Sequence, residues 1–173
     1  MLSNIEMILL SIVNEKASYA YEIDKMLVQR SMRDWLKIGV APVYQVLDRL
    51  EKKGLVSSKK ERQGKMPVRK RYFISKKGKD RLKKDVKELL SSSELFYLDL
   101  NVGLECSYLL SDNDLKKSLS DRLEKSKDEL EKIRDDFEKQ KFFLPLRERL
   151  IYKNLIEFRE TEEKLLVNIL DEV

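Results

Sequence analysis

The sequence has no histidine and a single cysteine, Cys106, among its 173 residues. A lone cysteine cannot form a disulfide within the chain, which suits a reducing compartment. Zinc sites built from cysteine and histidine are excluded because only one such ligand exists, and so is general-base catalysis by histidine. We expect Cys106 to act as small apolar filler, with oxidant sensing as the alternative.

Helix breakers and long apolar runs are also scarce. Only five glycines and three prolines interrupt the chain, which predicts long helices. No apolar stretch approaches the roughly 18 residues that a membrane span needs. The opening residues, MLSNIEMILLSIVNEK, have no basic leader before their apolar run, so they indicate an amphipathic helix and not a signal peptide. We therefore expect a cytoplasmic protein with no membrane partner.

Acidic residues are scarce in one part of the chain only. Residues 1–80 hold 18 basic and 9 acidic side chains, whereas residues 81–173 hold 18 basic and 22 acidic. Within residues 49–79, 13 basic side chains outnumber two acidic ones. This asymmetry predicts a basic module that meets a polyanion and a mixed-charge module with another role.

Hydrophobic periodicity changes at Gly54. Before it, apolar residues recur at helical spacing, and after it they alternate as in strands. The resulting order of elements is that of a winged helix-turn-helix with a two-stranded wing. The expected elements are a helix opened by a Ser3–Glu6 capping box, a helix over about Tyr19–Met32, the connector DWLKIG, a helix over about Pro42–Lys53, strands in LVSSKKE and VRKRYFIS, and a helix from Lys76 that Ser75 caps and that turns Leu82, Val86, Leu89 and Leu90 inward.

The wing and its exit are unusually basic. The stretch KKERQGKMPVRKRYFISKKGK (59–79) holds ten Lys or Arg and one acid, Glu61. Charges on a hairpin edge protect it against pairing with another strand, but a few charges suffice for that. The near-absence of acids over residues 49–79 therefore favours contact with nucleic acid over a merely soluble wing.

Two apolar stripes run along the C-terminal half, on either side of a break at Pro145. Stripes this narrow are typical of a helix–helix seam. We expect both an antiparallel pair within the chain and a dimerisation arm. The expected fold is mainly α, with a winged helix-turn-helix DNA-binding domain over 1–90 and a long-helix dimerisation and possible effector domain over 91–173. The expected dimerisation residues are Leu115, Leu119, Leu123, Leu130, Ile151, Leu155, Phe158, Leu165 and Ile169.

Three motifs resemble those of the PadR-like transcriptional regulators. SYAYEI (18–23) is similar to the family's Gly-Tyr-Glu-Ile, VYQVLDRLEKKGLV (43–56) to its recognition-helix segment, and RKRYFISKKGKDRL (69–82) to its wing and exit. The chain departs from the family where Ala20 replaces a glycine, where Ala41-Pro42 replace a Gly-Thr or similar pair, and where Ser75 replaces a threonine. The resemblance implies a homodimeric, ligand- or stress-responsive repressor with a helical C-terminal dimer domain.

The third helix and the wing carry the expected DNA contacts. Gln45 and Arg49 lie one turn apart on one face, and their side chains suit adenine and guanine edges in the major groove. The Tyr44 hydroxyl should meet a phosphate, and Asp48 should pair with Arg49 or Lys52 or accept from a cytosine amine. A two-fold dimer would place its recognition helices about 34–36 Å apart and read an inverted repeat. The expected contacts are Tyr44, Gln45, Arg49, Lys52, Lys59, Lys60, Arg62, Lys65, Arg69 and Arg71.

Aromatic residues raise the question of a small-molecule effector. Trp35, the only tryptophan, is expected to pack in a core, and the alternative places it in an effector pocket with Phe96, Tyr97 and Tyr108. Phe142, Phe143 and Tyr152 are further candidates for lining such a pocket.

Two other classes of protein are alternatives to a DNA-binding repressor, a binding scaffold and an enzyme. A winged-helix scaffold that binds protein or RNA is the alternative to a DNA-binding repressor. No nucleophile–base pair, glycine-rich phosphate loop or metal cluster is evident, so we expect neither an enzyme nor a cofactor.

Overall fold

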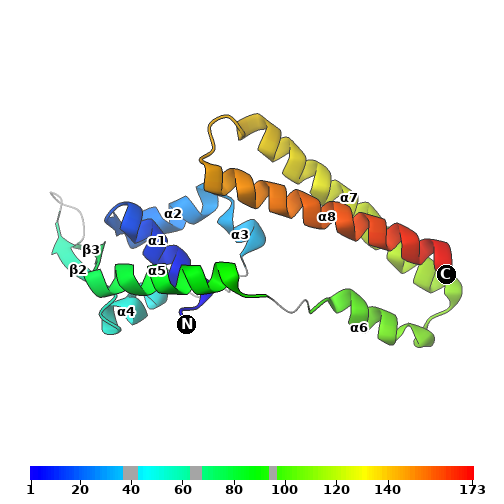
Figure 1. The fold of residues 1–173 in the computed structure, drawn as a ribbon, viewed down its shortest axis with the longest axis horizontal. Helices are drawn as coiled ribbons and strands as arrows, with labels where there is room; N and C mark the ends of the chain where they lie inside the picture. Colours follow the sequence, from blue (N-terminus) through cyan, green and yellow to red (C-terminus); the bar gives the residue numbers. More distant parts are fainter. Residues whose placement is uncertain (37–42, 63–67, 94–96) are drawn as a thin grey trace. The chain divides into compact units, whose positions relative to one another are not determined.

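A computed structural model describes residues 1–36, 43–62, 68–93 and 97–173 (Figure 1). The chain divides into two compact units, Met1–Leu95 and Phe96–Val173. Most of the described chain is helical and one small antiparallel sheet accompanies the helices, which confirms the expected mainly α winged-helix fold.

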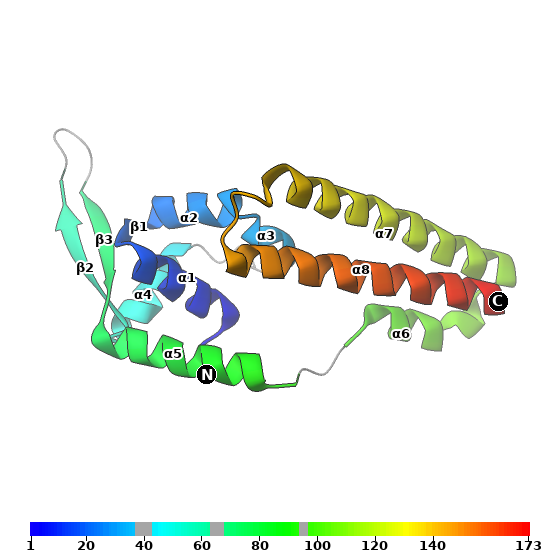
Figure 2. The same cartoon turned by 45° about the horizontal axis from the view of Figure 1, so that its top comes forward.

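The N-terminal unit consists of five helices and a three-stranded sheet in its described residues. Figure 2 shows the two longer strands side by side, extending away from the helices of this unit. The sheet order is β1-β3-β2, with both pairs antiparallel. The helices are α1 (Asn4–Glu15), α2 (Ala20–Gln29), α3 (Met32–Trp35), α4 (Val43–Lys52) and α5 (Lys76–Ser91), and the strands are β1 (Ser18–Tyr19), β2 (Val56–Glu61) and β3 (Arg69–Ile74).

The core of this unit lies between α1, α2, α4 and the sheet. Leu9, Leu10, Ile23, Leu27 and Leu47 have no exposed surface. Burying one such side chain contributes about 1.5–3 kcal/mol. The core therefore fixes the helices to which the exposed, charged side chains are attached.

Helix caps follow the sequence closely. The Glu6 N–H donates to Ser3 Oγ at 3.4 Å while the Ser3 N–H donates to Glu6 Oε2 at 3.1 Å, which confirms the capping box. Ser75 Oγ accepts from the Gly78 N–H at 2.9 Å. These bonds satisfy N–H groups that the first turn of a helix leaves without partners.

Two parts of the N-terminal unit differ from the expectation. The wing has a third strand, because Ser18 and Tyr19 pair with Tyr72 and Arg71 of β3. The helix expected over 19–32 ends at Gln29, since Ser31 adopts a left-handed conformation with φ of 49° and α3 starts after it. A left-handed residue cannot continue a right-handed helix.

Helix α5 presents a different face to the core than expected. Val86 and Leu90 are 38% and 82% exposed, so their assignment to the inward face was wrong, whereas Leu82 and Leu89 do pack against the core. The inward position between these two leucines belongs to Asp85, which is 1% exposed. Its carboxylate accepts from the Leu2 N–H at 2.6 Å and from Arg81 Nε at 2.8 Å. Burial raises the pKa of Asp85, but these two donors outweigh it and the pKa lies below its ordinary value.

The C-terminal unit consists of α6 (Asp99–Glu105), a 3-10 turn (Ser107–Leu109), α7 (Asp112–Gln140) and α8 (Leu146–Glu172). Ser111 caps α7 by accepting from the Asp114 N–H at 3.2 Å, and Pro145 precedes α8. Helices α7 and α8 pack side by side as an antiparallel pair (Figure 1). Across the described ranges of the chain, no helix combines the length and apolar character needed to cross a membrane.

The apolar stripes of α7 and α8 are only partly enclosed within this unit. Leu119 and Leu130 are buried, and Leu166 has no exposed surface. The stripe predicted for α8 ran through Leu165, which is 41% exposed, and through Phe158, which is 52% exposed. The inward leucine of α8 is therefore Leu166 and not its neighbour.

Candidate nucleic-acid interface

Helix α4 has one fully buried side and one exposed side. Val46, Leu47 and Leu50 lie at 0% exposure in the core, which fixes the rotation of the helix about its axis. The exposed side carries Tyr44, Gln45, Asp48, Arg49 and Lys52. Tyr44 is 58% exposed, so its ring is not a core aromatic and its hydroxyl is accessible.

Asp48 does not make the expected ion pair within α4. Its Oδ1 instead lies 3.4 Å from Lys70 Nζ, on strand β3. The same ammonium lies 3.4 Å from Glu51 Oε2, and Ser58 Oγ of β2 donates to Glu51 Oε1 at 2.6 Å. The recognition-type helix is thus tied to both long strands of the sheet.

The pKa values of this cluster shift as its contacts dictate. The hydrogen bond with Asp48 is the main cause that raises the pKa of Lys70 above its ordinary value. The hydrogen bond from Ser58 is the main cause that lowers the pKa of Glu51. Lys70 and Glu51 therefore both keep their charges near neutral pH.

The opposite face of β3 is a layer of cations over aromatic rings. The Arg69 guanidinium lies 5.1 Å from the centroid of the Tyr21 ring, and the Arg71 guanidinium lies 5.5 Å from that of Tyr19. The two tyrosine rings stack with centroids 5.8 Å apart. Cation–π contacts of this kind hold a guanidinium in place while leaving part of its edge exposed.

Glu61, the one acid of residues 59–79, is engaged at the end of β2, where it is paired with Arg69 in the ladder. The Tyr19 hydroxyl donates to Glu61 Oε2 at 2.6 Å, and Arg71 Nη1 lies 3.7 Å from the same oxygen. The hydrogen bond with Glu61 raises the pKa of Tyr19. Arg71 Nε also donates to the carbonyl oxygen of Ala17 at 3.3 Å. Arg71 therefore anchors the wing to β1, and the negative charge of Glu61 is compensated there.

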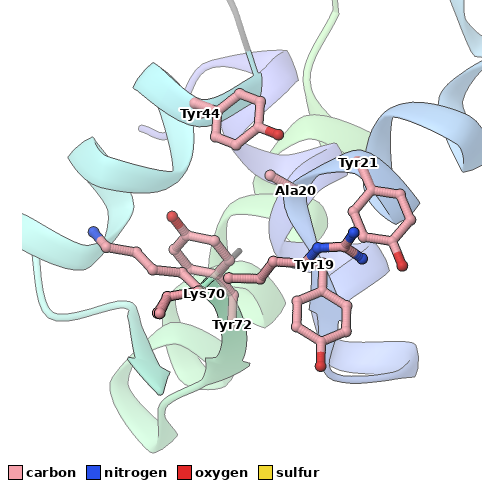
Figure 3. A pocket seen from close by; sticks show the side chains of 8 residues that line it. Tyr19, Ala20, Tyr21, Tyr44, Lys70 and Tyr72 are labelled. Carbon is pink, nitrogen blue, oxygen red and sulfur yellow. The ribbon is translucent and has the colours of Figure 1, made fainter. Parts of the chain in front are cut away.

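A hollow of about 270 Å³ lies where the start of α2, α4 and β3 meet. Figure 3 shows Tyr19 and Tyr21 on one side of it and Tyr44 on another, with Tyr72 and Lys70 contributed by β3. Burial raises the pKa of Tyr72. The hollow combines tyrosine hydroxyls with cationic groups, a donor set that suits an anion such as a phosphate. Its lining residues are Tyr19, Ala20, Tyr21, Tyr44, Val68, Arg69, Lys70 and Tyr72.

The structure brings most of the predicted DNA-contact residues onto α4 and the wing. Gln45, Arg49 and Lys52 on α4 and Lys59, Lys60 and Arg62 on the wing are exposed. Lys65 lies outside the described residues. The sequence prediction omitted Tyr21 and Lys70, both of which line the hollow. Lys70 shares a face of β3 with Tyr72, as strand alternation requires, but its partners on α4 depend on tertiary packing.

The predicted effector residues do not form one group within either unit. Trp35 packs against the core of the N-terminal unit, as expected for the core role. Tyr97 and Tyr108 belong to the C-terminal unit and are 86% and 81% exposed. Phe96 lies outside the described residues.

Cys106 and the acidic residues are the remaining side chains that could react or bind a metal. Cys106 is an exposed free thiol, so the expectation of buried filler was wrong. Among the described residues, no three or more of the metal-binding side chains gather into a group that could hold a metal ion.

Comparison with known proteins adds a family and a fold. Residues 9–84 match the model of the transcriptional regulator PadR-like family. No curated protein matches the sequence. Among solved structures, Bacillus subtilis PadR in complex with operator DNA is similar, with a TM-score of 0.81 and 17% identity over 97% of this chain and 98% of that chain.

Two further solved structures have the same fold. Bacillus subtilis PadR in complex with p-coumaric acid has a TM-score of 0.76 and 16% identity over 97% of each chain. The Vibrio cholerae virulence activator AphA has a TM-score of 0.74 and 16% identity over 98% of this chain and 97% of that chain. At these identities the likeness establishes a shared fold along nearly the whole chain.

Proposed function

We propose that this chain is a PadR-like transcriptional regulator, a cytoplasmic homodimeric repressor that reads an inverted repeat in duplex DNA and responds to a small-molecule effector. Residues 9–84 match the model of the PadR-like family, and Bacillus subtilis PadR in complex with operator DNA has the same fold. The observation that carries the proposal is the single basic surface formed by α4 and the wing. Its residues 49–79 hold 13 basic and two acidic side chains, and each acid lies close to a cation of β3, Glu51 to Lys70 and Glu61 to Arg71.

Sequence reading is assigned to α4. Its exposed side carries Gln45 and Arg49 one turn apart, in reach of neighbouring base pairs when the helix lies in a major groove. Lys52, two turns along from Tyr44 on the same side of the helix, is assigned to the phosphate backbone.

Backbone binding is assigned to the wing and to the hollow beside α4. Lys59, Lys60, Arg62, Lys65 and Arg69 are proposed to follow the phosphates or the minor groove. In the hollow, the Tyr21 and Tyr44 hydroxyls are assigned to a phosphate. We keep Arg71 among the proposed contacts, although Ala17 and Glu61 already engage its guanidinium. Such contacts position the helix and give the binding its dependence on salt.

Dimerisation is assigned to the C-terminal unit. Phe158 and Leu165 on α8 are 52% and 41% exposed, and Val102 on α6 is 65% exposed. Phe158 and Leu165 are seven residues apart, so they lie on one side of α8, and exposed apolar side chains along one side of a helix fit a helical partner. A second copy of the chain would give the two-fold symmetry that an inverted repeat requires.

The effector is proposed as a small aromatic acid. Support comes from the similar structure of Bacillus subtilis PadR in complex with p-coumaric acid and from the exposed aromatic residues Tyr97 and Tyr108 of this chain. Binding of such a molecule would release DNA if it stabilised one spacing of the two wings over another. Since AphA of Vibrio cholerae is an activator, the sign of regulation is tested by a reporter gene placed behind the selected site.

The direct test is selection of bound duplexes from a random pool with the full chain, repeated with Gln45→Ala and Arg49→Ala. We expect the parent to select an inverted repeat and each variant to lose base preference at one position of each half-site. The control is Lys132→Ala, an exposed residue of α7 that should leave the selected sequence unchanged. If both α4 variants select the parent's sequence, α4 is not the reader, and preferential capture of RNA over duplexes would favour the scaffold alternative.

A further inference from the structure

The exposed side of α4 carries two acids in an otherwise cationic surface, and the structure treats them differently. Both carboxylate oxygens of Glu51 are engaged, Oε1 by Ser58 Oγ at 2.6 Å and Oε2 by Lys70 Nζ at 3.4 Å. The Glu51 side chain is 32% exposed. Glu51 therefore serves to brace α4 against the two long strands.

Asp48 has a freer carboxylate. Its side chain is 52% exposed, and Lys70 Nζ contacts Oδ1 at 3.4 Å. Within the described part of the chain, no hydrogen bond or ion pair of Oδ2 with another residue is seen. Asp48 lies one turn from both Tyr44 and Lys52, so these three form a line along the exposed side of the helix. That line is adjacent to the one formed by Gln45 and Arg49.

A carboxylate in this position has a narrow choice of partner in DNA. It only accepts hydrogen bonds, and the major-groove edges of guanine and thymine present only acceptors or a methyl group. Adenine presents its N6 amine beside an acceptor, N7, and this acceptor repels a carboxylate. Cytosine offers its N4 amine without an adjacent acceptor of its own.

Lys70 reduces the repulsion between an acid and a DNA surface. A bare carboxylate beside phosphates would lower affinity for every sequence, because like charges repel. The Lys70 ammonium, 43% exposed and in contact with Asp48 and Glu51, offsets part of that charge from the side of β3. It also restricts the orientation of the Asp48 side chain.

We infer that Asp48 is a specificity-determining residue that accepts a hydrogen bond from the N4 amine of one cytosine in each half-site, and that Lys70 is the positioning residue that holds it. This inference rests on the proposed function and adds the base that this side of α4 selects.

The test is selection from a pool of duplexes with 20 random base pairs, using the parent, Asp48→Ala, Asp48→Asn and Asp128→Asn. The parent should require cytosine at one position of each half-site, and its affinity should fall about 5- to 150-fold when that cytosine is replaced. Asp48→Ala should lose the preference, whereas Asp48→Asn should prefer adenine there, since asparagine suits the adenine edge. Asp128→Asn, on an exposed position of α7, is the matched control, and it should keep the cytosine. Identical base preferences for all four proteins, with a uniform rise in affinity for the Asp48 variants, would show that Asp48 only balances the charge of Lys70.

A second measurement uses the selected duplex with the critical cytosine replaced by pyrimidin-2-one, which lacks the N4 amine. The affinity of the parent for this duplex should fall by the same factor as when the cytosine is replaced, whereas the affinity of Asp48→Ala should stay the same. The effects of the change in the protein and the change in the DNA should therefore not add. Lys70→Met should weaken the cytosine preference and Lys70→Arg should restore it. If the parent selects a site through Gln45 and Arg49 but Asp48→Ala keeps the cytosine, only this inference fails. If the parent selects no sequence, the proposed function fails as well.

Discussion

In the N-terminal unit, helices α1, α2 and α4 enclose a core with Leu9, Leu10 and Leu47 at its centre, whereas the long helices of the C-terminal unit meet around Leu100, Leu119 and Leu166. Helix α8 leaves Phe158 and Leu165 exposed. The first unit therefore has the apolar burial to hold charged side chains in fixed positions. The second carries apolar surface that a single chain leaves uncovered, as expected of a surface that pairs with another copy.

The ionic contacts of the two units differ in the same way. In the N-terminal unit, charged side chains connect separate elements of the interface, as Lys70 connects β3 to α4. In the C-terminal unit, they bridge the two long helices, as in the pair between Arg122 and Glu162 at 2.7 Å. Exposed ion pairs contribute little to stability, so we expect those of α7 and α8 to matter less than the apolar contacts.

Among substitutions in the two units, the largest loss of stability is expected for Leu47→Ala in the core of the N-terminal unit. Removal of a fully buried leucine side chain should cost about 2–5 kcal/mol in the free energy of unfolding, because a cavity remains. Urea denaturation followed by circular dichroism measures this. Val28→Ala, at a position that is 60% exposed, is the control and should cost under about 0.5 kcal/mol. Equal effects of the two substitutions would contradict the assignment of the core.

Asp85→Asn tests the buried carboxylate that holds the start of the chain to α5. Loss of its charge-assisted hydrogen bonds to the Leu2 N–H and Arg81 should cost about 1–3 kcal/mol at neutral pH. Because the folded-state pKa of Asp85 is lowered, its contribution is present above the unfolded-state value of 3.8 and is lost as pH falls through the folded-state value. Urea denaturation at neutral and acidic pH should show the parent and variant converging in acid. Asp80→Asn, on the exposed side of α5, is the control. A difference in the free energy of unfolding between the parent and Asp85→Asn that stays constant at every pH would contradict the explanation.

Leu165→Glu tests whether the exposed side of α8 forms the dimer. A charge placed in an apolar contact should weaken self-association by at least about 10-fold, or about 1.4 kcal/mol. Sedimentation equilibrium measures the association constant, and Lys164→Glu on the neighbouring exposed position is the control. An unchanged dimer would assign the interface to another surface, and a parent that is monomeric at micromolar concentration would remove the dimer from the account.

The smallest effect is expected for Arg122→Ala. This residue pairs with Glu162, but its side chain is 42% exposed, so the loss should be about 0.2–1 kcal/mol. The same denaturation experiment measures it, with Lys125→Ala as the control on an exposed position of α7. A loss as large as that of Leu47→Ala would mean that ions, and not apolar contacts, hold the C-terminal unit together.

The order of elements could be predicted because local signals agree with it. The change of hydrophobic period at Gly54 marks the passage from α4 to the wing, and the caps at Ser3, Ser75 and Ser111 mark helix starts. Strand β1 has two residues, too few for alternation to show. The break at Ser31 was missed because a serine in a left-handed conformation gives no sequence signal comparable to glycine.

Partners across elements could not be predicted. Asp48 has Arg49 and Lys52 close in sequence, yet the fold brings Lys70 to it from β3. In α8, Leu165 and Leu166 lie seven and eight residues after Phe158, so each is about two helical turns along from it, and only packing against α7 selects Leu166. Periodicity identifies a face to within about one residue, whereas burial depends on the neighbouring element.

The basic surface of α4 and the wing is the feature on which DNA binding depends most, and the salt dependence of duplex binding tests its role most directly. If a dimer makes about 6–10 phosphate contacts, the affinity of the full chain for its selected duplex should fall about 10³- to 10⁵-fold between 50 and 200 mM salt. Fluorescence anisotropy with a labelled duplex measures this. A chain that stays folded by circular dichroism at 50 mM salt yet binds no duplex from the random pool would contradict the central claim.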